Sequence, residues 1–341
     1  MRNPALDALR GAAILLVFSR HIGIPIFGRF GWVGVDLFFV LSGFLVSRLL
    51  FREFQNTGHL RPGRFLIRRG FKIYPQFYFM IGLSAAWAAG SHLEAGHVLS
   101  EIFFFQNYHQ GLWGHTWTIA IEEHFYLSLA LGLAWVARRG GFQQLPRWIG
   151  AICVLTLALR LATWIWRPDD SFMVHVAPSH LRIDSLLVGV LISYLEAFHN
   201  AGICGFMKRF GAWLPFVSIG LLSPVAFMLQ VDPFIYTIGF SMSAWAFALL
   251  LLTTLHRRQA PKAGVMAWLG RISYAFYLWQ GPALLACEKV GLGKWETMPV
   301  AFSGTVLIAW LTTRLIEEPF LRMRDAPVAG HAEKISPRHA E

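Results

Sequence analysis

The sequence has few charged residues for its length. Asp, Glu, Lys and Arg make up 14% of the 341 residues, whereas a soluble domain carries about a quarter. Hydrophobic residues make up 55% and gather in long blocks, which lipid accommodates and a soluble core does not require. The scarcity of charge therefore argues against a soluble fold and indicates a membrane protein.

Cysteine and several catalytic motifs are also scarce or missing. The three cysteines form no C-x-x-C pair, so we expect neither a disulfide framework nor a bound metal. The sequence has no G-x-S-x-G elbow, no P-loop, no G-x-G-x-x-G and no H-E-x-x-H. These absences argue against a serine hydrolase of the elbow type, a nucleotide-binding fold and a zinc protease.

Ten apolar stretches are each about 20 residues long, the length that crosses a bilayer. No small-residue cleavage site follows the first, so we expect it to remain a membrane helix. The predicted spans lie roughly at 8–27, 33–51, 73–90, 117–137, 148–166, 180–198, 211–230, 234–255, 269–288 and 298–317. We predict an all-α polytopic membrane bundle of about ten transmembrane helices over residues 1–324, followed by a flexible polar cytoplasmic tail at 325–341.

Basic residues between the spans predict the orientation. The net charge is +11, and Lys and Arg concentrate in alternate loops, whereas the loop at 91–116 contains neither. The positive-inside rule then places both termini in the cytoplasm and this loop outside. In a membrane protein such a charge indicates topology, contacts with membrane lipids and an anionic ligand, and we expect no nucleic-acid partner.

Four basic residues form a cluster on the predicted cytoplasmic side. Arg10 lies near the start of the first span, and Arg68, Arg69 and Lys72 precede the third. Because residues i and i+4 share one helix face, Arg68 and Lys72 point the same way. Guanidinium groups bind phosphate oxygens in bidentate fashion, so the cluster suits an anion with several phosphates. The alternative is a role in topology and lipid contact only, which is the role we assign to Arg61 and Arg64.

A second polar group lies deeper and toward the opposite side. His21 is eleven residues after Arg10, about 16 Å along a helix, and Glu122 and Asp36 lie at similar depth. A histidine oriented by a carboxylate is a general-base arrangement, which we assign to His21 with Glu122 or Asp36. The alternatives are structural: a hydrogen bond between helices for His21 and a helix N-cap for Asp36. The remaining members of this group are Glu123, Arg182 and Asp184.

Seven sequence blocks, in order, resemble the acyltransferase 3 family of bacterial membrane proteins over about residues 4–324. The blocks are 10–21 (R-x10-H), 34–45 (GVDLFFVLSGFL), 68–75 (RRGFKIYP), 115–126 (HTWTIAIEEHFY), 182–186 (RIDSL), 269–279 (LGRISYAFYLW) and 316–320 (IEEPF). The chain departs from the family pattern at three places: Lys72 stands for the usual Arg, His124 for a frequent Gln and Gln280 for a common His.

The resemblance implies acetyl-CoA or another acyl-CoA as donor, and a hydroxyl of a cell-surface or lipid-linked carbohydrate as acceptor. It also implies a multi-pass protein of the bacterial cytoplasmic membrane. With it, we expect His21, Glu122 and Asp36 to act in catalysis and Arg10, Arg68, Arg69 and Lys72 to bind the phosphates of CoA. Intramembrane acids and histidines also occur in proton-coupled transporters, so transport of a glycan or acyl group is the alternative, and a structural scaffold is a weaker one.

Overall fold

The computed structural model describes residues 3–24, 27–88, 94–168, 172–228, 232–257 and 264–325, and every regular element in these ranges is a helix. In chain order they are α1 (Pro4–Ile22), α2 (Phe27–Phe30), α3 (Val33–Thr57), α4 (Pro62–Ala88), α5 (Ala95–Ile102), α6 (Trp117–Arg138), α7 (Leu145–Trp166), α8 (Phe172–His175), the 3-10 turn η1 (Ser179–Leu181), α9 (Ile183–Phe198), α10 (Asn200–Phe210), α11 (Leu214–Phe227), the π-helical turn η2 (Ile235–Gly239), α12 (Phe240–Leu255), α13 (Val265–Arg271), α14 (Ser273–Lys289), α15 (Lys294–Thr312), the π-helical turn η3 (Thr313–Glu317) and α16 (Glu318–Asp325).

The predicted all-α membrane fold is confirmed, and each predicted span overlaps a helix. Within the described ranges, five helices are long and apolar enough to cross a membrane, or six if α9 and α10, bent by 108°, count as one span. This is fewer than the predicted ten. Helices α1 and α4 carry charged and polar residues that reduce their hydropathy, and α11 is only 14 residues long. The predicted tail lies outside the described residues except for Asp325.

Sequence signals at both ends of α1 explain where this helix begins and ends. The Asn3 side chain accepts a hydrogen bond from the Ala5 amide at 2.9 Å, and Pro4 occupies the first turn, as is favourable at a helix start. Gly23 ends the helix with φ of 71°, and its amide and that of Ile24 bond back to the last turn, as in a Schellman motif. These caps fix the position of His21 in the final turn.

Glycines hold the central helices together. A Cβ on Gly43 of α3 would overlap the Leu186 carbonyl oxygen of α9, and a Cβ on Gly189 of α9 would overlap the Val40 carbonyl oxygen of α3. Helices in lipid associate through such close backbone approach at small residues. The same kind of contact joins α1 and α13 at Gly11. The two helices that carry Arg10, His21 and Asp36 are therefore fixed by backbone contact.

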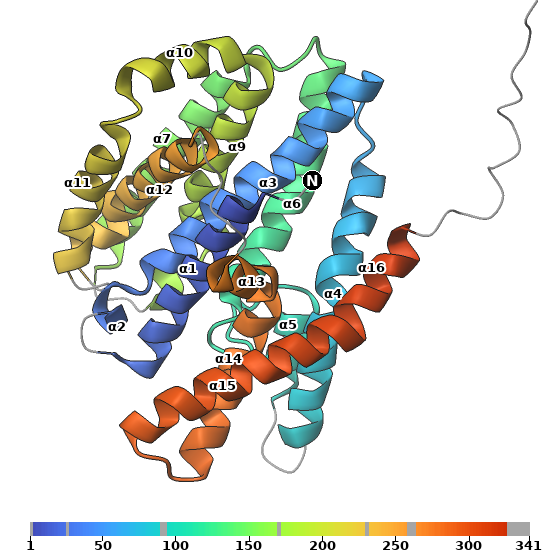
Figure 1. Cartoon of the computed structure of the whole chain (residues 1–341), viewed down its shortest axis with the longest axis vertical. Coiled ribbons are helices and arrows are strands. Elements are labelled where there is room, and N and C mark those ends of the chain that lie inside the picture. Colours follow the sequence, from blue (N-terminus) through green and yellow to red (C-terminus); the bar gives the residue numbers. More distant parts are fainter. Residues whose placement is uncertain are drawn as a thin grey trace, which may run out of the picture.

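The bundle has two ends that matter for the site (Figure 1). At the α10 end, α3 finishes beside the end of α9, where Gln55 donates to the Ala197 carbonyl at 2.8 Å. At the opposite α2 end, α1 finishes beside α2, where Arg20 donates to the Gly28 carbonyl at 3.3 Å. Helices α15, η3 and α16 form one long rod across the bundle in Figure 1, which brings α16 beside α4.

Candidate active site

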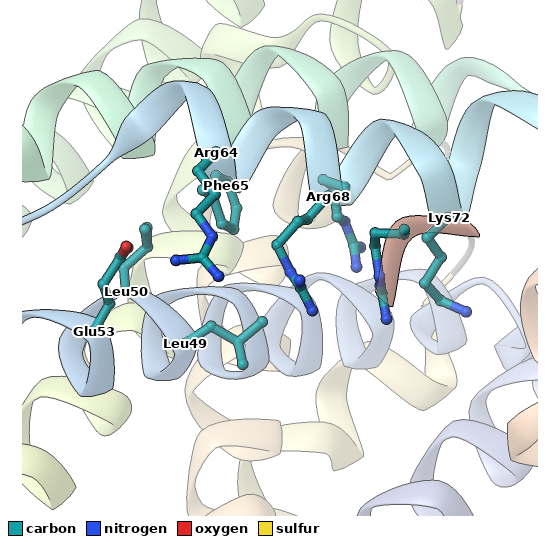
Figure 2. A pocket seen from close by; sticks show the side chains of 9 residues that line it. Leu49, Leu50, Glu53, Arg64, Phe65, Arg68 and Lys72 are labelled. Carbon is teal, nitrogen blue, oxygen red and sulfur yellow. The ribbon is translucent and has the colours of Figure 1, made fainter. Parts of the chain in front are cut away.

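A cationic cavity opens near the α10 end between α3 and α4. Its volume is about 500 Å³, and Arg64, Arg68 and Lys72 extend from α4 toward α3 in Figure 2. They stand four residues apart, so one face of α4 presents all three. The charged lining residues are Glu53, Arg64, Arg68, Arg69, Lys72 and Arg324. Five cations and one acid give the lining itself an excess of positive charge.

The cations of this cavity are held from α6 and from the C-terminal rod. Lys72 pairs with Glu317, and Arg68 pairs with Asp325 at 3.0 Å. Arg69 donates to the Tyr126 hydroxyl at 2.6 Å and lies 4.4 Å from the centre of its ring. The structure therefore brings together Arg68, Arg69 and Lys72 as predicted, and it adds Arg64 and Arg324.

A chain of hydrogen bonds leads from this cavity into the bundle. The Tyr126 hydroxyl, which accepts from Arg69, donates to Glu122 at 2.7 Å, and the Ser42 hydroxyl donates to the other Glu122 oxygen at 2.6 Å. Arg10 lies close enough to interact electrostatically with Glu122. Glu122 therefore accepts hydrogen bonds from two hydroxyls and lies beside two guanidinium groups. Glu122 thus belongs with the cations.

A narrow cavity of about 50 Å³ follows, lined by Arg10, Ser42, Glu122 and several aromatic residues. Val35 and Tyr277 line both this cavity and a larger one beyond it. The Tyr277 hydroxyl donates to the His115 carbonyl and accepts from Thr118 at 2.7 Å. These bonds hold Tyr277 as part of the wall between the two spaces.

The larger cavity, of about 370 Å³, lies at the α2 end and contains His21. The Nδ1 atom of His21 is 2.8 Å from the Val17 carbonyl oxygen. A carbonyl can only accept, so Nδ1 carries the proton and Nε2 keeps its lone pair. His21 is exposed to this space. The Nε2 atom of His21 can therefore accept a proton from a group in this cavity.

A second histidine, His115, lines the same cavity, with its ring centroid 6.3 Å from that of His21. Its Nε2 lies 3.3 Å from the Leu278 carbonyl oxygen. Burial, followed by the nearby His21, lowers the pKa of His115 to about 3. The His115 imidazole is therefore neutral near pH 7. Trp32, Trp117 and Phe172 complete an aromatic wall.

The structure does not join His21 to either predicted carboxylate by a hydrogen bond within the described residues. Glu122 is engaged by Ser42 and Tyr126, as described above. Asp36 pairs with Arg182 of the α9 N-cap and accepts from Ser243 of α12. The interpretation of Glu122 as a neighbour of His21 placed it on the wrong side of Tyr277. The depth in the membrane that the sequence predicts could not reveal these partners, because depth does not give the direction in which a side chain points.

Sequence reasoning also missed six residues, and it gave no signal for one of them, Arg324 of α16. A stripe at i, i+4 and i+8 could have identified Arg64 beside Arg68 and Lys72, but the residue was assigned to topology. The other four, Tyr126, Ser42, His115 and Tyr277, lie within three of the family-like blocks, but only packing shows that they line or connect the cavities.

The parts are those of a membrane enzyme that moves a group from an anionic donor to an acceptor: a cationic cavity, a polar connection and a base. Residues 3–314 match the family model Acyl_transf_3, described as an acyltransferase domain. The chain therefore belongs to the acyltransferase 3 family, as the sequence blocks predicted, and it is a multi-pass membrane protein.

Curated relatives carry more specific names. The chain is 26% identical to the peptidoglycan O-acetyltransferase OatA of Listeria monocytogenes, over 93% of this chain and 55% of that protein. It is 24% identical to the Bacillus subtilis protein named "Putative peptidoglycan O-acetyltransferase YrhL", over 93% of this chain and 54% of that protein. The chain thus spans about half the length of the curated relatives it matches. No solved structure matches it significantly.

Proposed function

We propose that this chain is an O-acetyltransferase that moves an acetyl group from acetyl-CoA, or an acyl group from another acyl-CoA, to a hydroxyl of a cell-surface or lipid-linked carbohydrate. One observation carries the proposal: hydrogen bonds link the lining of a cationic cavity to the narrow cavity around Arg10 and Glu122, which in turn shares Val35 and Tyr277 with a histidine-lined cavity. An anionic carrier held at one end would present its acyl group toward a base at the other.

The cationic cavity suits the phosphates of CoA. Arg64, Arg68, Arg69 and Lys72 would bind phosphate oxygens, with guanidinium groups able to do so in bidentate fashion. Arg10 lies further in, near Glu122, where it would meet the carrier arm and not the nucleotide. The narrow cavity of about 50 Å³ would have to widen as the thioester arm passes, and Val35 and Tyr277 form the wall that would move.

The transfer step follows from the tautomer of His21. Its Nε2 removes the proton from the acceptor hydroxyl, and that oxygen attacks the thioester carbonyl. The carbon–sulfur bond then breaks, and His21 returns the proton to the CoA thiolate. Glu122 acts as a positioning residue, because it holds Tyr126 and Arg69. Asp36, which pairs with Arg182, acts through the packing of α3.

We infer the chemical class of the acceptor from the names of the relatives and from the lining of the cavity at the α2 end. OatA is named a peptidoglycan O-acetyltransferase, and the aromatic wall formed by Trp32, Trp117 and Phe172 offers flat apolar surfaces to a sugar ring. We place the chain in the bacterial cytoplasmic membrane with ten spans and both termini in the cytoplasm. The α10 end then faces the cytoplasmic supply of acyl-CoA, and the α2 end faces the cell surface.

The test uses the full chain, purified in nanodiscs, with acetyl-CoA and soluble peptidoglycan or capsule oligosaccharides. Release of the CoA thiol, with an acetyl group on the oligosaccharide by mass spectrometry, would support the proposal. The His21→Gln variant should bind acetyl-CoA and release no thiol. Movement of a glycan or acyl group across a bilayer without thiol release would instead favour a proton-coupled transporter. Wild-type release by His21→Gln would contradict the assigned base.

A further inference from the structure

A serine and a histidine form a second polar cluster that lines none of the three cavities described above. Ser179 begins η1, and its Oγ lies 2.7 Å from the Nδ1 atom of His124, on α6. The side-chain amide of Asn107 donates to the same Oγ at 2.9 Å. Because Asn107 supplies one proton to the oxygen, the Ser179 hydroxyl proton is available to His124. A hydroxyl that donates to an imidazole is the usual pairing of a nucleophile with its base.

A strained backbone segment supports the histidine. The Phe104 carbonyl interacts with the His124 ring, and since Nδ1 faces Ser179, this carbonyl favours a proton on Nε2. Phe104 has φ of 57°, a left-handed conformation that is unfavourable for a residue with a side chain. Its ring is stacked on Phe77 with centroids 5.0 Å apart, so packing maintains the conformation. Strain that packing maintains in this way occurs often at functional sites.

Ser179 is held by a buried side chain, yet it can be reached from the surface. Asn107 is fully buried, donates also to the Ala177 carbonyl at 3.3 Å, and its Oδ1 has no hydrogen-bond partner among the described residues. Tyr108 and Phe105 are exposed, and their ring centroids lie 6.2 and 5.7 Å from that of His124. Ser179 itself is partly exposed. A small ester could therefore approach the hydroxyl past these two aromatic rings.

We propose that Ser179, with His124 as its base, is a second acyl-transfer centre that accepts the acyl group of an O-acyl ester at the α2 end of the bundle. His124 Nδ1 takes the proton as Ser179 Oγ bonds to the acyl carbon. The ester carbon–oxygen bond breaks, and the departing alkoxide takes the proton from His124. A hydroxyl or water then attacks the acyl-serine, loses its proton through His124, and Ser179 recovers it. This centre is independent of acyl-CoA and of His21.

The experiment treats the purified full-length chain in detergent with a fluorophosphonate probe, which bonds to an activated serine as fluoride leaves. Peptide mass spectrometry then locates the label, and its rate is followed over time. We expect the label on Ser179, none in Ser179→Ala, and a rate at least about 100-fold lower in His124→Gln, the scale of a lost general base. Ser128→Ala is the matched control, since Ser128 is exposed on α6 and bonds only to the His124 carbonyl.

The outcomes separate this proposal from the acetyl-CoA reaction. His21→Gln should keep the wild-type labelling rate at Ser179 even though it loses thiol release. A second readout is wild-type protein incubated with p-nitrophenyl acetate, which should carry an acetyl group on Ser179. If the folded wild-type protein is unlabelled at Ser179, or if His124→Gln is labelled as fast as wild type, the cluster only ties η1 to α6 and the proposal is wrong.

Discussion

Two groups of charged side chains lie inside this bundle, and they differ in how they are balanced. Between α3, α7, α9 and α12, each cation faces an acid: Arg182 binds Asp36, and Arg160 binds Asp184. In the cavity between α3 and α4, five cations outnumber three acids: Glu53 in the lining, Glu317 paired with Lys72, and Asp325, which Arg68 and Arg324 share. Buried charges with opposite partners need no ligand, whereas an excess of one sign leaves room for one. The balance of charge, more than its presence in the membrane, marks the site.

The largest expected effect is the loss of a balanced pair. Arg182 is 1% exposed and lies over the Phe240 ring, 3.6 Å from its centre. Arg182→Ala would leave Asp36 buried without its cation, which costs about 3–5 kcal/mol. We expect a lower Tm in detergent and a poor yield of monodisperse protein, as measured by tryptophan fluorescence and gel filtration.

A double variant tests whether pairing is the cause. Asp36→Asn with Arg182→Gln removes both charges, so it should recover part of the Tm lost in the single variant. If Arg182→Ala melts at the wild-type temperature, the Arg182–Asp36 pair contributes no stability. The interpretation of the paired charges as structural, in contrast to those of the active site, would then be wrong.

His21 provides the opposite result, a loss of activity without a loss of fold. Its ring faces a cavity and bonds only through Nδ1 to its own helix, so His21→Gln should keep the wild-type Tm. Removal of a general base lowers the rate by about 10²–10⁴-fold, measured as thiol release at saturating acetyl-CoA. His115→Gln is the comparison within the same cavity. Equal Tm losses in both would mean that the two histidines hold the fold.

Much of the fold followed from the sequence, because apolar length and periodicity are local properties. Ten apolar stretches located the helices, although α1 carries too many charged residues and α4 too many polar ones to qualify as spans by composition alone. Residue spacing also grouped Arg68 with Lys72, since both lie on one face of α4. What failed was the inference that His21 contacts Glu122 or Asp36. His21 and Glu122 lie at similar depth, yet Tyr277 and Val35 lie at the wall between their cavities.

Asp36 shows why depth misled the assignment. A carboxylate near His21 in depth met the criterion for an orienting acid, but its partner is 146 residues away in sequence, at Arg182. Such a pair forms only because Gly43 and Gly189 allow α3 and α9 to touch. Nothing local to either helix predicts which of the acids on this side finds a cation.

A third kind of buried acid has no ion-pair partner among the described residues. Glu101 of α5 is fully buried, and burial raises its pKa from 4.5 to about 7, although Thr116 and the Trp113 amide donate to it at 2.8 and 3.2 Å. The folded chain then keeps this proton to about pH 7, whereas the unfolded chain loses it near 4.5. The free energy of unfolding should therefore fall as the pH rises between these two values, by on the order of 3 kcal/mol.

The pH effect is measured as the difference in Tm between pH 5 and pH 8. Glu101→Gln keeps an oxygen for both donors and cannot ionise, so it should reduce that difference. A wild-type protein whose Tm rises over this range, or a Glu101→Gln protein with the same difference, would show that Glu101 is charged in the fold.

The smallest effect distinguishes a cation that lines the cavity from one that does not. Arg64 lines it, whereas Arg61 is exposed and donates to the His59 ring at 3.2 Å. Arg64→Gln should weaken acetyl-CoA binding about fivefold, close to 1 kcal/mol, and the loss should shrink at high salt because screening weakens phosphate attraction. Arg61→Gln removes the same charge three residues earlier and should leave the Kd within twofold, as measured by microscale thermophoresis. Equal weakening by both variants would mean that net charge near the membrane, and not the geometry of this cavity, attracts the donor.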